Sequence, residues 1–147
     1  MVSTLFLGVL DLNTGVLEFA SGGHTPPILL RDGSATELPQ DDGPALALSP
    51  DLEFPRNQLQ LVSGDRLAIY TDGIDEAFDE TAIMYGTERV LDSVAESGML
   101  PTGEAGPAMV GAVDKFAGDA PQSDDITLLL LDIASTGAPQ QASTVVS

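Results

Sequence analysis

Short apolar runs separated by turn-forming residues dominate the first half of the chain. Residues 2–10, VSTLFLGVL, form a nearly continuous apolar run, and DLNTG at 11–15 separates it from a second run at 16–20. Because Asn, Asp and Gly favour tight turns, this pattern predicts a β-hairpin. Similar runs predict further strands at 28–31, 35–38, 57–62, 66–70 and 126–133. Ser63-Gly64-Asp65 is expected to join 57–62 to 66–70 as a second hairpin.

Two later segments show helical periodicity. The first is expected to begin at Thr87 and to end near Ser97-Gly98, with Val90 and Val94 on its apolar face. The second is expected over 103–117, with a start later than Thr102 because glycine and proline weaken its first turns. Its apolar stripe consists of Met109, Ala112, Val113 and Phe116. Both stripes are typical of core-facing helices.

The composition narrows the functional classes. The 147 residues carry a formal net charge of −18 and include only five scattered basic residues, which argues against nucleic acid and anionic membranes as partners. No cysteine is present, so disulfides, thiolate metal sites and cysteine nucleophiles are excluded. With no apolar run of spanning length, we expect a cytoplasmic protein. Residues 134–147 lack charge and periodicity and are expected to be a disordered tail.

Two carboxylate-bearing junctions are the candidate functional elements. In LAIYTDGIDEA, at 67–77, an alternating strand ends at Asp72, and Gly73 allows a turn or a close approach. About fifty residues later, Asp124-Asp125 precedes a buried-type strand. Each has a structural alternative: Asp-Gly is a common hairpin turn, and the Asp pair can be a solvated loop that satisfies backbone donors.

The two junctions meet if their strands are antiparallel neighbours, since the end of one then lies beside the start of the other. Such a pair is half of a site for Mg²⁺ or Mn²⁺, which bind carboxylate oxygens and retain several waters. A metal-bound water can attack phosphorus without a protein nucleophile. His24, the only histidine, is either a structural turn residue or part of a substrate-facing loop; no partner for it is visible in the sequence.

A family resemblance rests on the order of several motifs. TLFLGVLDLNTGVLEFASGGHTPP, LVSGDRLAIYTDGIDEA, YGTERV and APQSDDITLLLLDI follow one another over residues 2–133. This series resembles the C-terminal two thirds of the metal-dependent (PPM-type) serine/threonine protein phosphatases, in their bacterial SpoIIE-like branch. The resemblance implies an α+β fold, a four-layer α/β/β/α sandwich of two antiparallel sheets, with a binuclear manganese or magnesium centre at one end.

The resemblance also assigns roles to residues of this chain. It implies that Asp72 and Asp124 ligate one of the two metals. Asp125 then belongs to the supporting shell, Gly73 makes the sharp turn after the ligand, and His24 is structural. No catalytic residue beyond the metal ligands is expected.

The chain departs from the family in one respect. Family members carry an early Gly-Asp motif, whose aspartate bridges both metals, on strands that precede anything like VSTLFLGVL. Neither Gly64-Asp65 nor Gly118-Asp119 is a credible substitute. We therefore expect residues 1–133 to form a partial phosphatase domain without its first third, with at most one weakly held metal, very low turnover and self-association through uncovered sheet edges.

Three functions remain open at this point. The first is metal-dependent hydrolysis of phosphoserine or phosphothreonine in a bacterial regulatory protein, for which the resemblance suggests a phosphorylated anti-sigma-factor antagonist as the substrate. The second is a non-catalytic remnant that binds a partner or completes another chain's fold. The third is an acidic module that binds a single metal ion.

Overall fold

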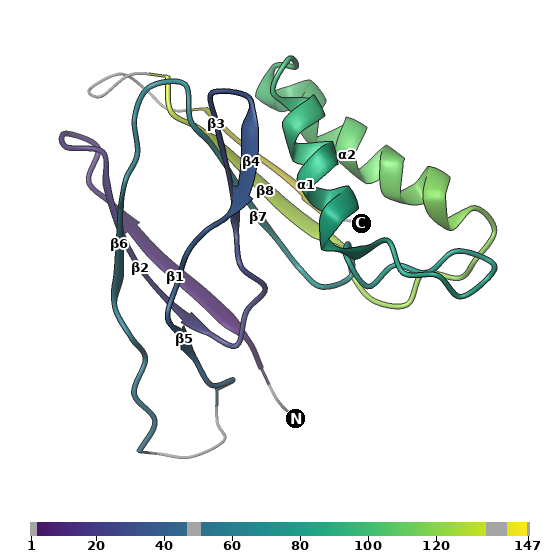
Figure 1. Ribbon diagram of the computed structural model, residues 1–147, viewed down its shortest axis with the longest axis horizontal. Helices are drawn as coiled ribbons and strands as arrows, with labels where there is room; N and C mark the ends of the chain where they lie inside the picture. The colour runs from purple at the N-terminus through teal and green to yellow at the C-terminus, as the bar shows by residue number, and fades with distance from the viewer. Residues whose placement is uncertain (1–2, 47–50, 135–140, 147) are drawn as a thin grey trace.

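The computed structural model describes residues 3–46, 51–134 and 141–146, which form two sheets and two helices (Figure 1). The first sheet contains β1 (Leu5–Leu10), β2 (Val16–Gly22), β5 (Asp42–Gly43) and β6 (Asn57–Gln60). The second contains β4 (Ser34–Glu37), β3 (Ile28–Arg31), β7 (Arg66–Tyr70), β8 (Thr127–Asp132) and β9 (Gln141–Val146), in that order across the sheet. The helices are α1 (Gly86–Ser97) and α2 (Thr102–Ala117).

The elements stack as sheet, sheet and helices. Both helices pack on the face of the second sheet that points away from the first sheet (Figure 1). All strand pairs are antiparallel except the short parallel pairing of β2 with β5. This confirms the predicted α+β sandwich of two antiparallel sheets. Of the four layers of the complete sandwich, the described residues supply three, since no helix covers the first sheet among them; the prediction was of a partial sandwich.

Strand β7 shows why the central strands are apolar along their whole length. Leu67 and Ile69 belong to the cluster between the two sheets, whereas Ala68 and Tyr70 belong to the cluster under the helices. Both faces of β7 are thus covered, as in other strands buried on two sides. The predicted division of this strand into two faces is confirmed.

One of the two predicted hairpins is confirmed and the other is wrong. Strands β1 and β2 pair antiparallel across the turn at 11–15. Strand β6 pairs with β2 in the first sheet, but β7 pairs with β3 and β8 in the second. The segment between them therefore crosses from sheet to sheet. Its Gly64, at φ 93°, donates to the Ile133 carbonyl at 2.7 Å, so this turn is bonded to the residue that follows β8.

Helix α2 begins at Thr102, earlier than predicted. It starts at Thr102 despite Pro107, because the N–H groups of Glu104 and Ala105 both donate to the Pro101 carbonyl at 2.9 Å. The Thr102 hydroxyl also donates to Asp132 Oδ2 at 2.5 Å, which ties the first turn to β8. Tertiary contacts thus outweigh the weak helix propensity of this segment.

The predicted disordered tail differs from the structure over Gln141–Val146. These residues form β9, which pairs with β8 in the register Thr127↔Val146 to Asp132↔Gln141. Val145 packs against the cluster under the helices. Pairing with the edge of β8 and this apolar contact therefore order a segment that has no charged residue. Residues 135–140 and 147, which the same prediction covers, lie outside the described residues.

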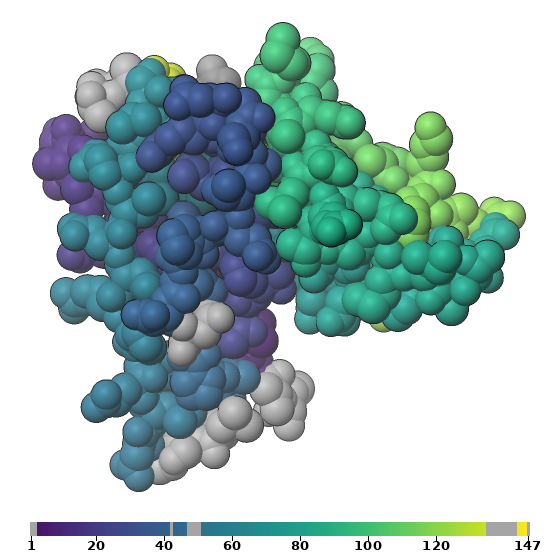
Figure 2. All heavy atoms as spheres, in the orientation of Figure 1, coloured from purple at the N-terminus to yellow at the C-terminus, as the bar shows by residue number. Residues whose placement is uncertain are grey.

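The first sheet presents apolar side chains on its outer face. Leu5, Leu7 and Val9 alternate along β1 and are 46%, 60% and 66% exposed. In the space-filling view the N-terminal strands form one side of the molecule and the helices the other (Figure 2). In the described residues, no helix lies on this outer face.

Candidate functional site

The two carboxylate junctions meet at one end of the second sheet. Strands β7 and β8 are antiparallel neighbours, and the pair Tyr70↔Leu128 closes their ladder next to both junctions. Beyond it, the Thr71 N–H donates to the Thr127 carbonyl at 3.0 Å, and the Thr127 N–H donates to Thr71 Oγ1 at 2.9 Å. Thr71 Oγ1 in turn donates to the Asp125 carbonyl at 3.0 Å. The side chain of Thr71 therefore fixes the end of β7 against the start of β8.

Gly73 allows the two loops to touch. A Cβ atom at this position would lie 2.5 Å from the Asp125 carbonyl oxygen and 3.2 Å from that of Asp124. The space is occupied by backbone, so any larger residue would push the loops apart. The turn after Asp72 is closed by the Glu76 N–H, which donates to the Asp72 carbonyl at 2.8 Å.

Asp72 and Asp124 supply exposed carboxylates on these touching loops. Asp124 Oδ1 also accepts the Asp125 N–H at 2.7 Å, which holds its side chain against its own loop. Carboxylate oxygens suit a hard cation such as Mn²⁺ or Mg²⁺. In the described residues, no group of three or more His, Cys, Asp or Glu side chains can surround a metal ion. The donor set fits one ion held by few protein ligands and otherwise by water.

Two polar groups under this loop are buried and lack a partner among the described residues: the hydroxyl of Tyr70 and Oδ1 of Asp75. Burial raises the pKa of Asp75, and the charges of Glu76 and Asp72 raise it further. Burial also raises the pKa of Tyr70, with a second contribution from Asp75. The Asp75 carbonyl accepts the Gly86 N–H at 2.8 Å, so the loop is bonded to the start of α1.

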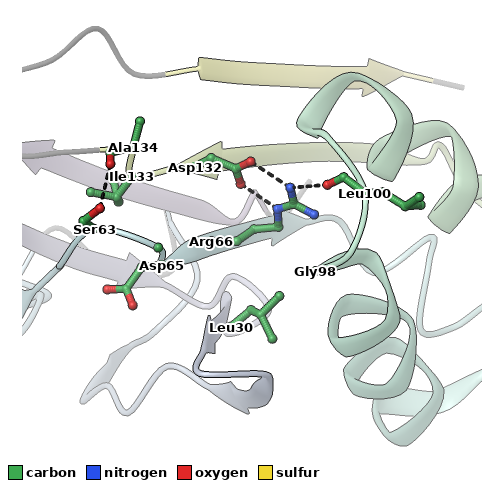
Figure 3. Close-up of a pocket in the computed structure, with 10 residues that line it drawn as sticks. Leu30, Ser63, Asp65, Arg66, Gly98, Leu100, Asp132, Ile133 and Ala134 are labelled. Carbon is green, nitrogen blue, oxygen red and sulfur yellow. Dashed lines mark hydrogen bonds and ion pairs between the residues drawn. The ribbon is translucent and has the colours of Figure 1, made fainter.

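The opposite end of β7 is neutralised by an ion pair. Arg66 donates from Nε and Nη2 to the two oxygens of Asp132, at 2.6 and 2.7 Å, and to the Leu100 carbonyl (Figure 3). Its Nη1 also donates to the Ser97 carbonyl at the end of α1. Burial alone would raise the pKa of Asp132, but hydrogen bonds from Arg66 and Thr102 lower it overall. A cavity of about 400 Å³ lies beside Arg66. Because every Arg66 N–H group already has an acceptor, this residue has no donor left for a ligand in the cavity.

The two Gly-Asp pairs lie in different places relative to the Asp72 and Asp124 loops. Asp65 is buried at the Arg66 end of β7, and Arg31 donates to both of its oxygens at 2.8 and 2.6 Å. The Asp119 N–H donates to Glu80 Oε1 at 3.1 Å, which places that pair on the loop after α2.

His24 lies in the loop between β2 and β3. Its Nδ1 is 2.9 Å from the Thr25 carbonyl, and its N–H donates to Ser21 Oγ at 3.3 Å. These local contacts are those of a turn histidine. A substrate-facing role for His24 stays a prediction.

Sequence reasoning missed Thr71 and Arg66 as organising residues. Thr71 stands directly before Asp72, so its position in the motif was the available signal. No sequence signal pointed to Arg66, because its partners Ser97, Leu100 and Asp132 are distant from it in the sequence.

Comparison with known proteins decides the family. The family model of Stage II sporulation protein E (SpoIIE) matches residues 1–134. The chain belongs to the SpoIIE family. It is thus a SpoIIE-like member of the PPM-type phosphatases, as the motif order predicted.

Two curated relatives and one solved structure illustrate the match. Protein IcfG of Synechocystis sp. is 31% identical over 94 residues, which are 64% of this chain and 15% of IcfG. Phosphoserine phosphatase RsbP of Bacillus subtilis is 26% identical over 125 residues, 84% of this chain and 29% of RsbP. The phosphatase domain of the cell fate determinant SpoIIE from Bacillus subtilis, presoaked with Mn, shares the fold with a TM-score of 0.68 at 20% identity.

That structural match covers 95% of this chain and 60% of the SpoIIE chain. The chain therefore spans less than a third of the length of the two curated relatives and about three fifths of the solved domain. Neither helix in the described residues is long and apolar enough to cross a membrane.

Proposed function

We propose that this chain carries the metal-binding half of a protein serine/threonine phosphatase that acts in bacterial signal transduction. The observation that supports it most is the contact between the Asp72 and Asp124 loops, which Thr71 and Gly73 hold together at the ends of β7 and β8. The similarity to phosphoserine phosphatase RsbP gives the reaction class.

Asp72 and Asp124 are the residues that would hold Mn²⁺ or Mg²⁺, with Asp125 and Gly73 as support. The ion supplies an acidified water for attack on phosphorus. In this proposal Asp72 and Asp124 bind the ion, and Thr71 and Gly73 keep the two loops that carry these carboxylates in contact. Because two cations a few ångströms apart repel, two carboxylates favour one ion over two, and we expect weak binding and slow turnover.

The proposed substrate is a phosphorylated regulatory protein of the bacterial cytoplasm, such as an anti-sigma-factor antagonist. The excess of acidic residues argues against nucleic acid as a partner, which agrees with a protein substrate.

Calorimetric titration of the chain with MnCl₂ tests the site directly. We expect one binding event in the native chain and its loss in Asp72→Asn and in Asp124→Asn. Asp32→Asn is the matched control, because it removes one charge in the β3–β4 turn, at the Arg66 end of the sheet. Unchanged titration in both site variants would refute the metal site. Release of phosphate from a serine-phosphorylated protein, with and without Mn²⁺, then measures activity.

The exposed face of β1 favours a second candidate, a module that binds a second copy or another chain. Leu7 and Val9 are the most exposed apolar side chains of this strand. We expect Leu7→Lys with Val9→Lys to abolish self-association in sedimentation experiments, and Met99→Lys, at a 91% exposed position between the helices, to leave it unchanged. A native chain that sediments as a monomer at all concentrations would refute self-association.

A further inference from the structure

A cavity of about 230 Å³ opens directly beside the two carboxylate loops. Gly73, next to Asp72, and Ser123, next to Asp124, both line it. The rest of the wall comes from the loop after β7, the last turn of α2 and the loop after α2. A group bound at the two carboxylates would therefore have its neighbouring side chains within reach of this cavity.

The walls of the cavity combine polar and apolar surface in nearly equal parts. The apolar part of the lining comes from Ala77 and Phe78, from Val113 and Ala117 of α2, and from Pro121. Its volume is below the roughly 300 Å³ that small-molecule sites usually need. Size and lining thus suit the stem of one long side chain.

The rim of the cavity is negative from three sources. Asp114, in the last turn of α2, is one of the lining residues. Glu80 Oε1 accepts the Asp119 N–H at 3.1 Å and would lie 3.2 Å from a Cβ atom at Gly118, so a second carboxylate stands at the end of α2. The final carbonyls of α2 add the negative end of the helix dipole.

A carboxylate at a helix C-terminus is unfavourable unless a cation lies nearby. Lys115 is the basic residue in the last turn of α2, and it is outside the cavity lining. Phe116, its neighbour, instead carries the Arg89 guanidinium 4.8 Å above its ring, on the side facing α1. The cavity therefore has Asp114 in its lining, Glu80 next to its lining residue Gly118, and several apolar side chains in its walls.

We propose that this cavity receives an arginine or lysine side chain of the phosphoprotein substrate, next to the phosphorylated residue. Such side chains combine an apolar stem with a cationic head, which matches the walls and the rim. Complementary charge would also steer the substrate toward a strongly acidic protein. This assignment rests on the proposed function, because it takes the phosphate to bind at a metal ion that Asp72 and Asp124 would hold.

Fluorescence anisotropy with labelled phosphoserine peptides tests the proposal in the presence of MnCl₂. The peptides have an alanine background, with one arginine placed in turn at each position around the phosphoserine. We expect one position to improve affinity about tenfold, and citrulline at that position to lose the gain. Equal affinity for all peptides would overturn the proposal.

Variants locate the effect. We expect Asp114→Asn with Glu80→Gln to abolish the arginine gain, and Glu104→Gln, which removes a charge at the other end of α2, to retain it. Ala117→Leu fills the cavity without changing charge and should also abolish the gain, with helix content checked by circular dichroism. A gain that survives both cavity variants would overturn the proposal.

Asp72→Asn separates this proposal from the metal site. Suppose that Asp72→Asn abolishes manganese-dependent binding of the phosphoserine peptide without arginine, and that arginine improves affinity at no position. The cavity proposal then fails and the metal site stands. If an Asp114-dependent gain appears and Asp72→Asn has no effect, the cavity stands and the metal site fails.

Discussion

Thr71 and Thr127 are joined by two hydrogen bonds, one from each residue's N–H, and only one of them continues the backbone ladder. The other ends on the Thr71 hydroxyl, which also reaches the Asp125 carbonyl. One side chain thus sets the separation of the loops that carry Asp72 and Asp124.

Replacing this hydroxyl should loosen the site. Thr71→Val keeps the shape of the side chain but leaves the Thr127 N–H without its acceptor, so we expect a loss of about 1 kcal/mol in the free energy of unfolding. Manganese affinity should fall about tenfold, the usual effect of removing a supporting hydrogen bond. Thr71→Ser retains the hydroxyl and should restore both values. Urea unfolding and calorimetric titration provide the measurements; equal behaviour of Val and Ser variants would contradict this role.

Enlarging Gly73 should separate the loops. A Cβ atom 2.5 Å from the Asp125 carbonyl cannot be accommodated without a backbone shift. We expect Gly73→Ala to lower both the melting temperature and the manganese affinity. Gly103→Ala, in the first turn of α2 where a Cβ atom would meet nothing within 4 Å, is the control and should not lower stability. A native-like titration of Gly73→Ala would show that the close approach is unimportant for binding.

Breaking the Arg66–Asp132 pair should destabilise the fold without touching the site. Arg66 is 5% exposed, and Arg66→Met removes its bonds to the Ser97 and Leu100 carbonyls and leaves Asp132 with the Thr102 hydroxyl but without its cation. We expect a loss of about 3 kcal/mol in the free energy of unfolding, measured in urea. Adding Asp132→Asn removes the unpaired charge and should recover part of the loss. Additive effects of the two substitutions would argue against a direct interaction.

Asp75 should make stability fall as pH rises. Its pKa is raised in the folded chain above the ordinary value of 3.8, first by burial, so the folded state holds a proton that the unfolded state has released. The favourable contribution is complete below pH 3.8 and is lost as pH rises through the folded pKa. Asp75→Asn should therefore melt higher than the native chain at neutral pH, and the difference should close in acid.

Thermal unfolding followed by circular dichroism over a pH series measures this difference. Asp92→Asn, which makes the same change in net charge on α1, serves as the control. A gap between native chain and Asp75→Asn that is constant with pH would contradict the assignment.

Local patterns predicted most of the elements but not how they pair. The alternation of residues around Leu67 and Ala68 correctly predicted that β7 has two faces. This was possible because each face packs in its own apolar cluster, which leaves a local pattern in the sequence. The prediction of a hairpin over 57–70 was wrong. The turn-forming residues Ser63-Gly64-Asp65 are equally compatible with a hairpin and with a connection that crosses from one sheet to the other. Strand β9 was missed because its order comes from the β8 edge, which no local pattern reveals.

The site was predictable to the level of its two junctions. Family likeness and antiparallel geometry predicted that the Asp72 and Asp124 junctions meet, and the structure places their loops in contact; metal binding by the two carboxylates stays a prediction. The supporting bonds of Thr71 depend on three-dimensional register, which spacing along the chain does not encode.

The pairing of β9 has a practical consequence for anyone who shortens this chain. A version ending at Ile133 would turn β8 into a border strand, and its row of unsatisfied backbone groups would invite fibre-like stacking of neighbouring molecules. Affinity tags are therefore better attached beyond residue 147 than in place of the final segment.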